Sequence, residues 1–139
     1  MAINEAIPYY EPGSRVSGRA TGAKVIGKRF VAIAQKKDLG SRELDTGASG
    51  GNIRVKPAVA DDPKTFGVAT FDAEDGKLTT VVRGGFVMPV TAGAALTAGQ
   101  FVKPGADGKA VVAADRATAY GMSLSDAAVD QDAIVALYS

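Results

Sequence analysis

Carboxylates are the side chains in this sequence that could do chemistry, because the chain contains no His and no Cys. Without those residues the Ser–His and Cys–His nucleophile systems are impossible, and the usual zinc sites lose both preferred ligands. Carboxylate oxygens can still serve as a general acid and base or hold a hard cation. Two acidic groups stand out: Asp72, Glu74 and Asp75, and then Asp126, Asp130 and Asp132.

Neither acidic group has the ligand spacing of a calcium-binding loop. The first lacks a Glu at the required later position, and the second lacks the central Gly. We therefore predict that both groups are solvated turn residues, that the protein uses no metal or other cofactor, and that it is not an enzyme. Turnover abolished by a single Asp→Asn change would instead indicate an enzyme that relies on carboxylates alone.

A Gly-rich stretch matches a phosphate-binding loop only in part. "GAKVIGKR", residues 22–29, fits G-x-x-x-x-G-K but ends in Arg29, where such a loop needs a Ser or Thr hydroxyl for Mg²⁺. The residues that follow, "RFVAIAQ", predict a strand and not the required helix. Net charge is +1 and no basic stripe occurs, so we predict no nucleotide and no nucleic-acid partner.

Turn and strand signals dominate the rest of the chain. Asp107-Gly108 lies between apolar runs and predicts a tight type I′ hairpin, and Asp75-Gly76 precedes another β-branched run. Pro89 indicates a sheet edge or a strand end, and residues 92–99 allow a helical turn. The fold class predicted is mainly β: a single small β-barrel or sandwich built of hairpins, with little helix. Strands are predicted at 15–20, 29–35, 53–58, 66–71, 78–83, 86–90, 100–103, 110–113, 119–125 and 133–138.

One sequence pattern recurs along the chain. Val-Lys-Pro occurs at residues 55–57 and 102–104, and each copy is followed by an aromatic-Gly pair, an Asp-Ala pair and a final apolar strand. We interpret residues 55–83 and 102–138 as an internal duplication of one β-unit. A weaker similarity links residues 21–31 with 91–102, where Gly27 aligns with Gly99. Turns that look alike by chance in a Gly/Ala/Val-rich protein are the alternative.

Composition and the first residues set the domain plan. We expect an extended N-terminal arm at residues 1–14 and one β domain at residues 15–139. There is no apolar run long enough to span a membrane, and we expect no signal peptide and synthesis in a cytoplasm. Within the arm, the candidates for partner contact are Ile3, Ile7, Tyr9, Tyr10 and Pro12. The tyrosines could instead cover the base of the domain's own barrel.

The order of these segments resembles the capsid decoration (cement) proteins of tailed bacteriophages, a group of small β-rich proteins. The similar pieces are "YYEPGSRVSGRATGAKVIGKRFVAI", "NIRVKPAVADDPKTFGVATFDAEDGKLTTVVRGGFVMPVTAGAALTAGQFV" and "AYGMSLSDAAVDQDAIVALYS", which together cover nearly the whole chain. The loop at residues 36–52 is the least family-like part. The resemblance implies a virion protein made in the host bacterium. It also implies homotrimers on the outer capsid surface that stabilise the lattice of the major capsid protein, with no catalytic residues.

A second function stays open beside this one. A host-surface or carbohydrate-binding β-module could also be displayed on a virion, and glycan-array binding would favour it. Such a module needs exposed aromatic platforms, yet the chain has no Trp and few Phe and Tyr. The phage and lattice, the surface that meets the capsid, the oligomeric state in solution and the role of the 36–52 loop are left open by the sequence.

Overall fold

The structure is a computed structural model, and it describes residues 15–34 and 53–138. The predicted arm and the 36–52 loop therefore lie outside the described residues. The same holds for the arm's candidate contact residues, which are Ile3, Ile7, Tyr9, Tyr10 and Pro12.

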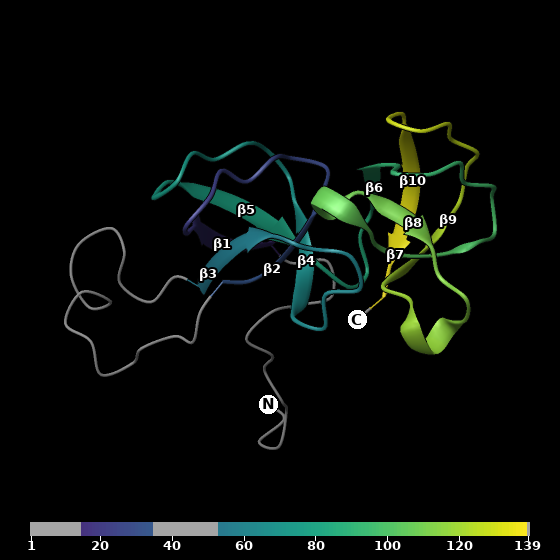
Figure 1. The fold of residues 1–139 in the computed structure, drawn as a ribbon, viewed down its shortest axis with the longest axis horizontal. Helices are drawn as coiled ribbons and strands as arrows, with labels where there is room; N and C mark the ends of the chain where they lie inside the picture. Colours follow the sequence, from purple (N-terminus) through teal and green to yellow (C-terminus); the bar gives the residue numbers. More distant parts are fainter. Residues whose placement is uncertain (1–14, 35–52, 139) are drawn as a thin grey trace, which may run out of the picture.

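Short strands build the described part of the chain (Figure 1), which confirms the predicted mainly β fold class. Helix is confined there to two 3₁₀ turns, η3 (Ala106–Gly108) and η4 (Arg116–Thr118). The strands are β1 (Arg15–Ala20), β2 (Phe30–Ile33), β3 (Ile53–Pro57), β4 (Thr65–Ala69), β5 (Leu78–Val82), β6 (Val87–Thr91), β7 (Phe101–Pro104), β8 (Ala110–Val112), β9 (Gly121–Ser123) and β10 (Asp132–Leu137).

Alternation along each strand decides which side chains enter the core. In β1, Val16, Gly18 and Ala20 are buried, whereas Arg15 and Ser17 are exposed and Arg19 is half-buried. Strand β10 has the same period, with buried residues at every second position. Successive side chains of a strand point to opposite faces, so this period fixes one inward face for each strand.

The strands form a closed barrel and a second sheet. The barrel has the order β1-β3-β2-β4-β5, and it closes because β1 pairs with both β5 (antiparallel) and β3 (parallel). The second sheet has the order β6-β10-β9-β7-β8. Figure 1 shows them as two lobes, the first purple to teal and the second green to yellow. We call residues 15–82 unit 1 and residues 87–137 unit 2.

Unit 2 repeats the strand order of unit 1, with β6 to β10 in the places of β1 to β5. The parallel closure between β1 and β3 is reduced in unit 2 to one parallel bridge, between Ala92 and Ala110. The turns match too, because an antiparallel bridge joins Val25 to Ala73 in unit 1 and Leu96 to Ala127 in unit 2. This correspondence supports our proposal of a duplication, which we extend to the whole of both units.

The paired bridges change two details predicted from sequence. Val25 matches Leu96, which places Lys28 (φ 64°) against Gly99 (φ 90°) instead of Gly27 against Gly99. Residues 92–99 do not form a helical turn, so that prediction was wrong. The amide of Leu96 donates to the carbonyl of Ala127 at 2.8 Å, and extended pairing therefore replaces helical bonds.

The Asp107-Gly108 hairpin is present and also serves the packing between the units. Both residues have positive φ, 59° and 74°, as a type I′ turn requires, and they connect β7 to the antiparallel β8. A Cβ on Gly108 would lie 2.4 Å from the carbonyl oxygen of Phe30. Position 108 therefore requires Gly for two reasons: its backbone has positive φ, and unit 2 approaches strand β2 of unit 1 too closely there for a side chain.

The buried residues form two clusters. One fills the interior of the barrel and includes Val25, Val31, Val55 and Val81. The other joins the units: it combines Phe30, Ala32, Ala58, Val68 and Val82 of unit 1 with the interior residues of unit 2. The Phe30 ring lies 6.2 Å from the Tyr120 ring, measured between centroids. These residues of unit 1, which lie outside the barrel interior, are therefore buried by unit 2.

Candidate functional site

Three of the acidic residues singled out from the sequence accept hydrogen bonds from backbone amides and so link one turn to another. Asp72 accepts a hydrogen bond from the Gly27 amide, and Asp126 accepts one from the Ala98 amide, both at 2.9 Å. These two bonds occupy equivalent places in units 1 and 2. Asp75 accepts a further amide bond, from Gly22, at 2.9 Å. Each carboxylate therefore satisfies a backbone donor in a tight turn, a common use of Asp.

The remaining acidic residues form ion pairs. Glu74 lies 3.4 Å from Lys24, Asp130 lies 2.7 Å from Lys109, and Asp132 lies 2.8 Å from Lys28. Within residues 15–34 and 53–138, the acidic side chains do not converge in any group of three or more that could hold a metal ion. The two acidic groups are therefore structural features of the turns and of the contacts between units.

The Gly-rich stretch at residues 22–29 also has a structural explanation. It runs through the Val25 bridge and leads directly into strand β2, so it does not open a helix that could bind phosphate. Its Lys28 donates to Asp132 of unit 2, and the Lys28 carbonyl accepts from the Thr91 amide at 2.8 Å. This turn therefore binds unit 1 to strands β6 and β10 of unit 2 through two hydrogen bonds.

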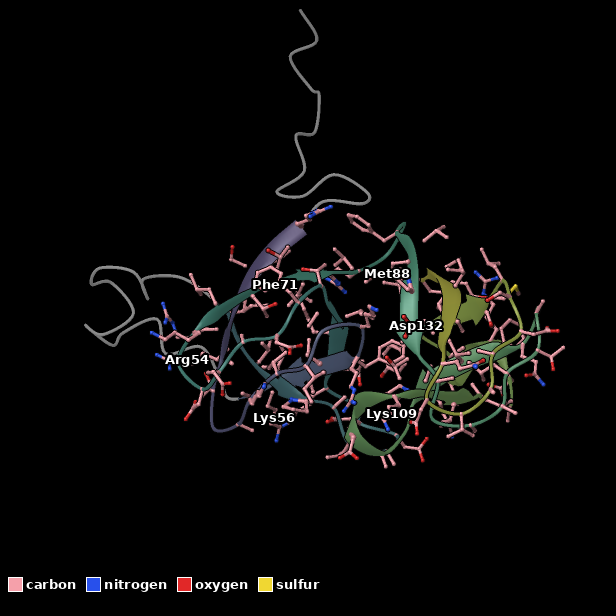
Figure 2. The ribbon with its side chains drawn as sticks, turned by 90° about the horizontal axis from the view of Figure 1, so that it is seen from above. Arg54, Lys56, Phe71, Met88, Lys109 and Asp132 are labelled. Atoms are coloured by element: carbon pink, nitrogen blue, oxygen red, sulfur yellow. The ribbon has the colours of Figure 1, made fainter. Side chains whose placement is uncertain are left out.

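Two Asp residues have lowered pKa values because of these contacts. The hydrogen bond from Lys28 is the main cause that lowers the pKa of Asp132 from its ordinary value of 3.8, with Thr91 contributing. The hydrogen bond from Lys109 likewise lowers the pKa of Asp130. Lys28 belongs to unit 1, and Asp132, which is labelled in Figure 2, belongs to unit 2. The stability of the contact between the units therefore depends on the protonation of Asp132.

We expect Asp132→Asn to lower the free energy of unfolding at pH 7 by about 0.5 kcal/mol, since the pair is partly exposed. Because the pKa of Asp132 is lower in the folded state than in the unfolded state, the ion pair stabilises the protein at pH values above the unfolded pKa. This contribution is lost as pH falls through the folded pKa. The difference from wild type should thus shrink below pH 3.8. Urea unfolding at several pH values measures it, with Glu74→Gln, in a more exposed pair, as the control expected near zero. An unchanged difference down to pH 2 would contradict the assignment.

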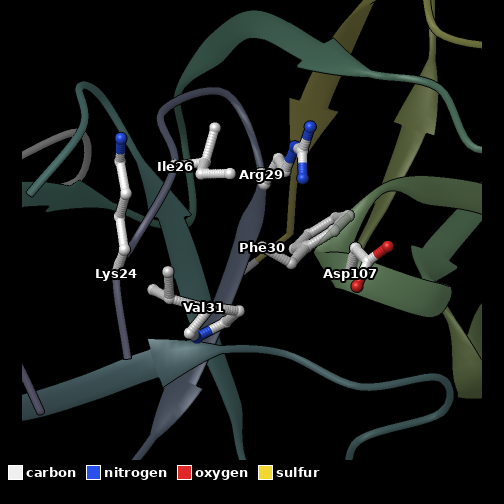
Figure 3. A pocket seen from close by; sticks show the side chains of 7 residues that line it. Lys24, Ile26, Arg29, Phe30, Val31 and Asp107 are labelled. Carbon is white, nitrogen blue, oxygen red and sulfur yellow. The ribbon is translucent and has the colours of Figure 1, made fainter. Parts of the chain in front are cut away.

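The described residues also line a shallow pocket beside strand β2. It holds about 210 Å³, less than the roughly 300–1,000 Å³ of typical small-molecule sites. Figure 3 shows Lys24 on one side and Asp107 on the other, with Phe30 and Val31 between them. Arg29 also lines the pocket, and its Nε is buried with no hydrogen-bond partner. The residues that line it include no Ser, Thr, Tyr, His or Cys that could act as a nucleophile or base.

An exposed apolar surface was missed by the sequence reasoning. Val87, Leu124 and Ile134 are 58%, 47% and 41% exposed, and they lie on or directly beside strands β6, β9 and β10. The available signal was the lack of polar alternation in "FVMPV" and "AIVAL", where both faces of the strand carry apolar side chains. A strand of this kind is either buried on both faces or leaves one apolar face exposed.

The described residues thus define a class of protein: a mainly β protein whose notable surface is apolar. The chain belongs to the phage cement protein family, whose model matches residues 10–137. Membership gives it a structural, capsid-associated role in the virion and implies that it is not an enzyme. Among the described residues, no helix has the length and apolar character needed to cross a membrane.

A solved structure shares the fold. It is the head fiber gp8.5 N base in bacteriophage phi29, with a TM-score of 0.64 and 24% sequence identity. The similarity covers 88% of this chain and 92% of that one. No curated protein matches the sequence.

Proposed function

We propose that this protein decorates the outer surface of a phage head as homotrimers and stabilises the lattice of the major capsid protein. The observation that supports it is the family match over residues 10–137. The protein would be made in the cytoplasm of the host bacterium and added to the capsid there. No nucleic acid would take part, in keeping with a net charge of +1.

The composition and fold suit attachment through many weak contacts. A trimer that binds three equivalent capsid sites gains avidity, so that modest affinity at each site is sufficient. The predicted arm, residues 1–14, is our candidate for the capsid contact, through Ile3, Ile7, Tyr9, Tyr10 and Pro12. An extended segment of this kind can add a strand to an exposed sheet edge of the capsid protein, with affinity supplied by backbone hydrogen bonds.

The test uses phage heads assembled without this protein. Purified protein should bind them saturably, at a copy number that is a multiple of three per lattice site, and should raise the temperature at which the heads lose their DNA. Quantitative mass spectrometry of the washed heads gives the copy number. Binding to the inner surface only, or saturation at one copy per site, would contradict the proposal.

A host-surface role is the second candidate. Its supporting observation is Phe71, an aromatic side chain that is 51% exposed beside the barrel (Figure 2) and could contribute to a glycan platform. A glycan array probed with the purified protein, and again with the Phe71→Ala variant, decides it. The absence of any signal would remove this candidate, and a signal that persists in the variant would show that Phe71 is not part of the glycan-binding surface.

A further inference from the structure

The outward surface of unit 2 is organised in two rows of residues that cross its strands. The first row runs Val87, Ala136, Met122 and Phe101, because Val87 pairs with Ala136, Ala136 with Met122 and Met122 with Phe101. The second row runs Pro89, Ile134 and Leu124, since Pro89 pairs with Ile134 and the Leu124 amide bonds to the Ile134 carbonyl. Both rows are apolar. We call Val87, Pro89, Met122, Leu124, Ile134 and Ala136 the apolar face.

Unit 1 has the same two rows, and its second row is polar. By the corresponding pairings, Ser17 and Thr80 stand where unit 2 has Pro89 and Ile134, and the Thr70 amide bonds to the Thr80 carbonyl. The fold therefore accepts polar residues at these positions. Folding alone does not explain why unit 2 has three exposed apolar residues there, and contiguous exposed apolar surface of this kind marks an interaction site.

Unit 1 also shows what covers such a surface. Its first row runs Arg15, Val82, Val68 and Phe30, and the last three of these are at most 1% exposed. They are buried because unit 2 packs against them, with Tyr120 facing Phe30. The corresponding row of unit 2 has no such cover: Val87 is 58% exposed, and Ala136, Met122 and Phe101 are only half-buried.

From this we infer that the apolar face is the surface through which one copy of this chain associates with the next. A β unit of this same kind already covers the matching row inside the chain, which makes a second copy the occupant favoured by the structure. The two rows carry no charge, as in permanent homo-oligomer interfaces and unlike the polar contacts of transient complexes. The inference rests on the proposed function in one respect: in a trimer, each copy would use the face once to close a ring.

The test compares two pairs of substitutions in the full-length chain. Val87→Lys with Ile134→Lys places two charges on the apolar face. The control, Val59→Lys with Val129→Lys, changes Val residues that are 59% and 55% exposed and belong to neither row. A third variant, Val87→Thr with Ile134→Thr, keeps β-branched side chains at both positions and so guards against a loss of folding. Circular dichroism verifies the fold of each.

Sedimentation equilibrium over a range of concentrations is the readout. Wild type and control should form the same oligomer, whereas the Lys pair should raise the midpoint concentration of dissociation by at least about tenfold, with the Thr pair intermediate. A monomeric wild type, or an oligomer that the Lys pair leaves intact, would overturn the inference. So would an oligomer that appears only after removal of residues 2–13, because the arm would then be the occupant.

Capsid binding separates this inference from the proposed function. If heads bind the wild type, and the Lys pair forms an unchanged oligomer that also binds heads, the inference is contradicted and the proposed function is not. Conversely, an oligomer broken by the Lys pair in a protein that binds no head would leave the inference standing and remove the proposed function. A monomeric wild type whose capsid binding is lost in the Lys pair would assign the face to the capsid protein instead.

Discussion

Phe30→Ala should lower the free energy of unfolding by about 3–5 kcal/mol, the usual cost of removing a buried aromatic side chain. Phe30 is 1% exposed and lies at the contact between units, where it faces Tyr120 and its carbonyl meets Gly108. The loss combines the lost transfer energy of the ring with a cavity that both units would need to rearrange to fill. In a chain of this size we expect the melting temperature to fall by roughly 10–15 °C.

Phe71→Ala is the matched control, because Phe71 is 51% exposed and its loss should cost less than about 1 kcal/mol. Both variants are measured by urea unfolding at one fixed protein concentration, since association with further copies shifts apparent stability. A cost for Phe30→Ala below about 1 kcal/mol would show that the units do not depend on this contact. Two separate unfolding transitions in the wild type would show that they fold independently.

Deletion of residues 2–13 should weaken capsid binding at least tenfold, about 1.4 kcal/mol, with the melting temperature almost unchanged. The arm has few apolar residues for a core of its own. Ordering it on a partner costs roughly 1–2 kcal/mol per residue, which must be offset by burying Ile3, Ile7, Tyr9 and Tyr10 and by backbone pairing. The expected loss of binding free energy is thus the small difference between the entropic cost of ordering the arm and the larger gain from burial and backbone pairing.

Tyr9→Ala with Tyr10→Ala should reproduce part of this loss, while Tyr9→Phe with Tyr10→Phe, which keeps the ring area, should bind more nearly as wild type does. Binding is measured by titrating labelled protein onto heads that lack it, and thermal unfolding is followed in parallel. A truncated protein that unfolds would make the arm an integral strand of the domain. Unchanged binding would place the capsid contact elsewhere, with the 36–52 loop as the next candidate.

Local sequence determined the strands and the turn between β7 and β8. Each observed strand falls within about two residues of its predicted position, since period-two alternation is read from neighbouring residues alone. The Asp107-Gly108 turn was predictable for a similar reason, because positive φ at both positions is a local requirement. Asp75-Gly76 was less so: only Gly76 has positive φ there, so this turn is of another type.

The sequence also predicted that most of the acidic residues lie in turns. It did not predict which groups they contact. Asp72 and Asp126 bond amides far away in sequence, and Lys28 finds Asp132 in the other unit. The candidate contacts in the arm remain predictions, because they lie outside the described residues. The apolar face could be suspected from strands without polar alternation, but the sequence does not say whether such a strand is buried on both faces or exposed on one.

Phe30 and Phe101 show what only the tertiary structure decided. Both are the first residue of the equivalent strands β2 and β7, and both are followed by a buried Val. Local sequence therefore treats them alike, yet Phe30 is 1% exposed while Phe101 is half-buried at the end of the uncovered row. The difference arises because unit 2 packs on the outward face of unit 1, a contact between elements distant in sequence. Alternation specifies which side of a strand is apolar, and the docking of whole units specifies which apolar side is left for a partner.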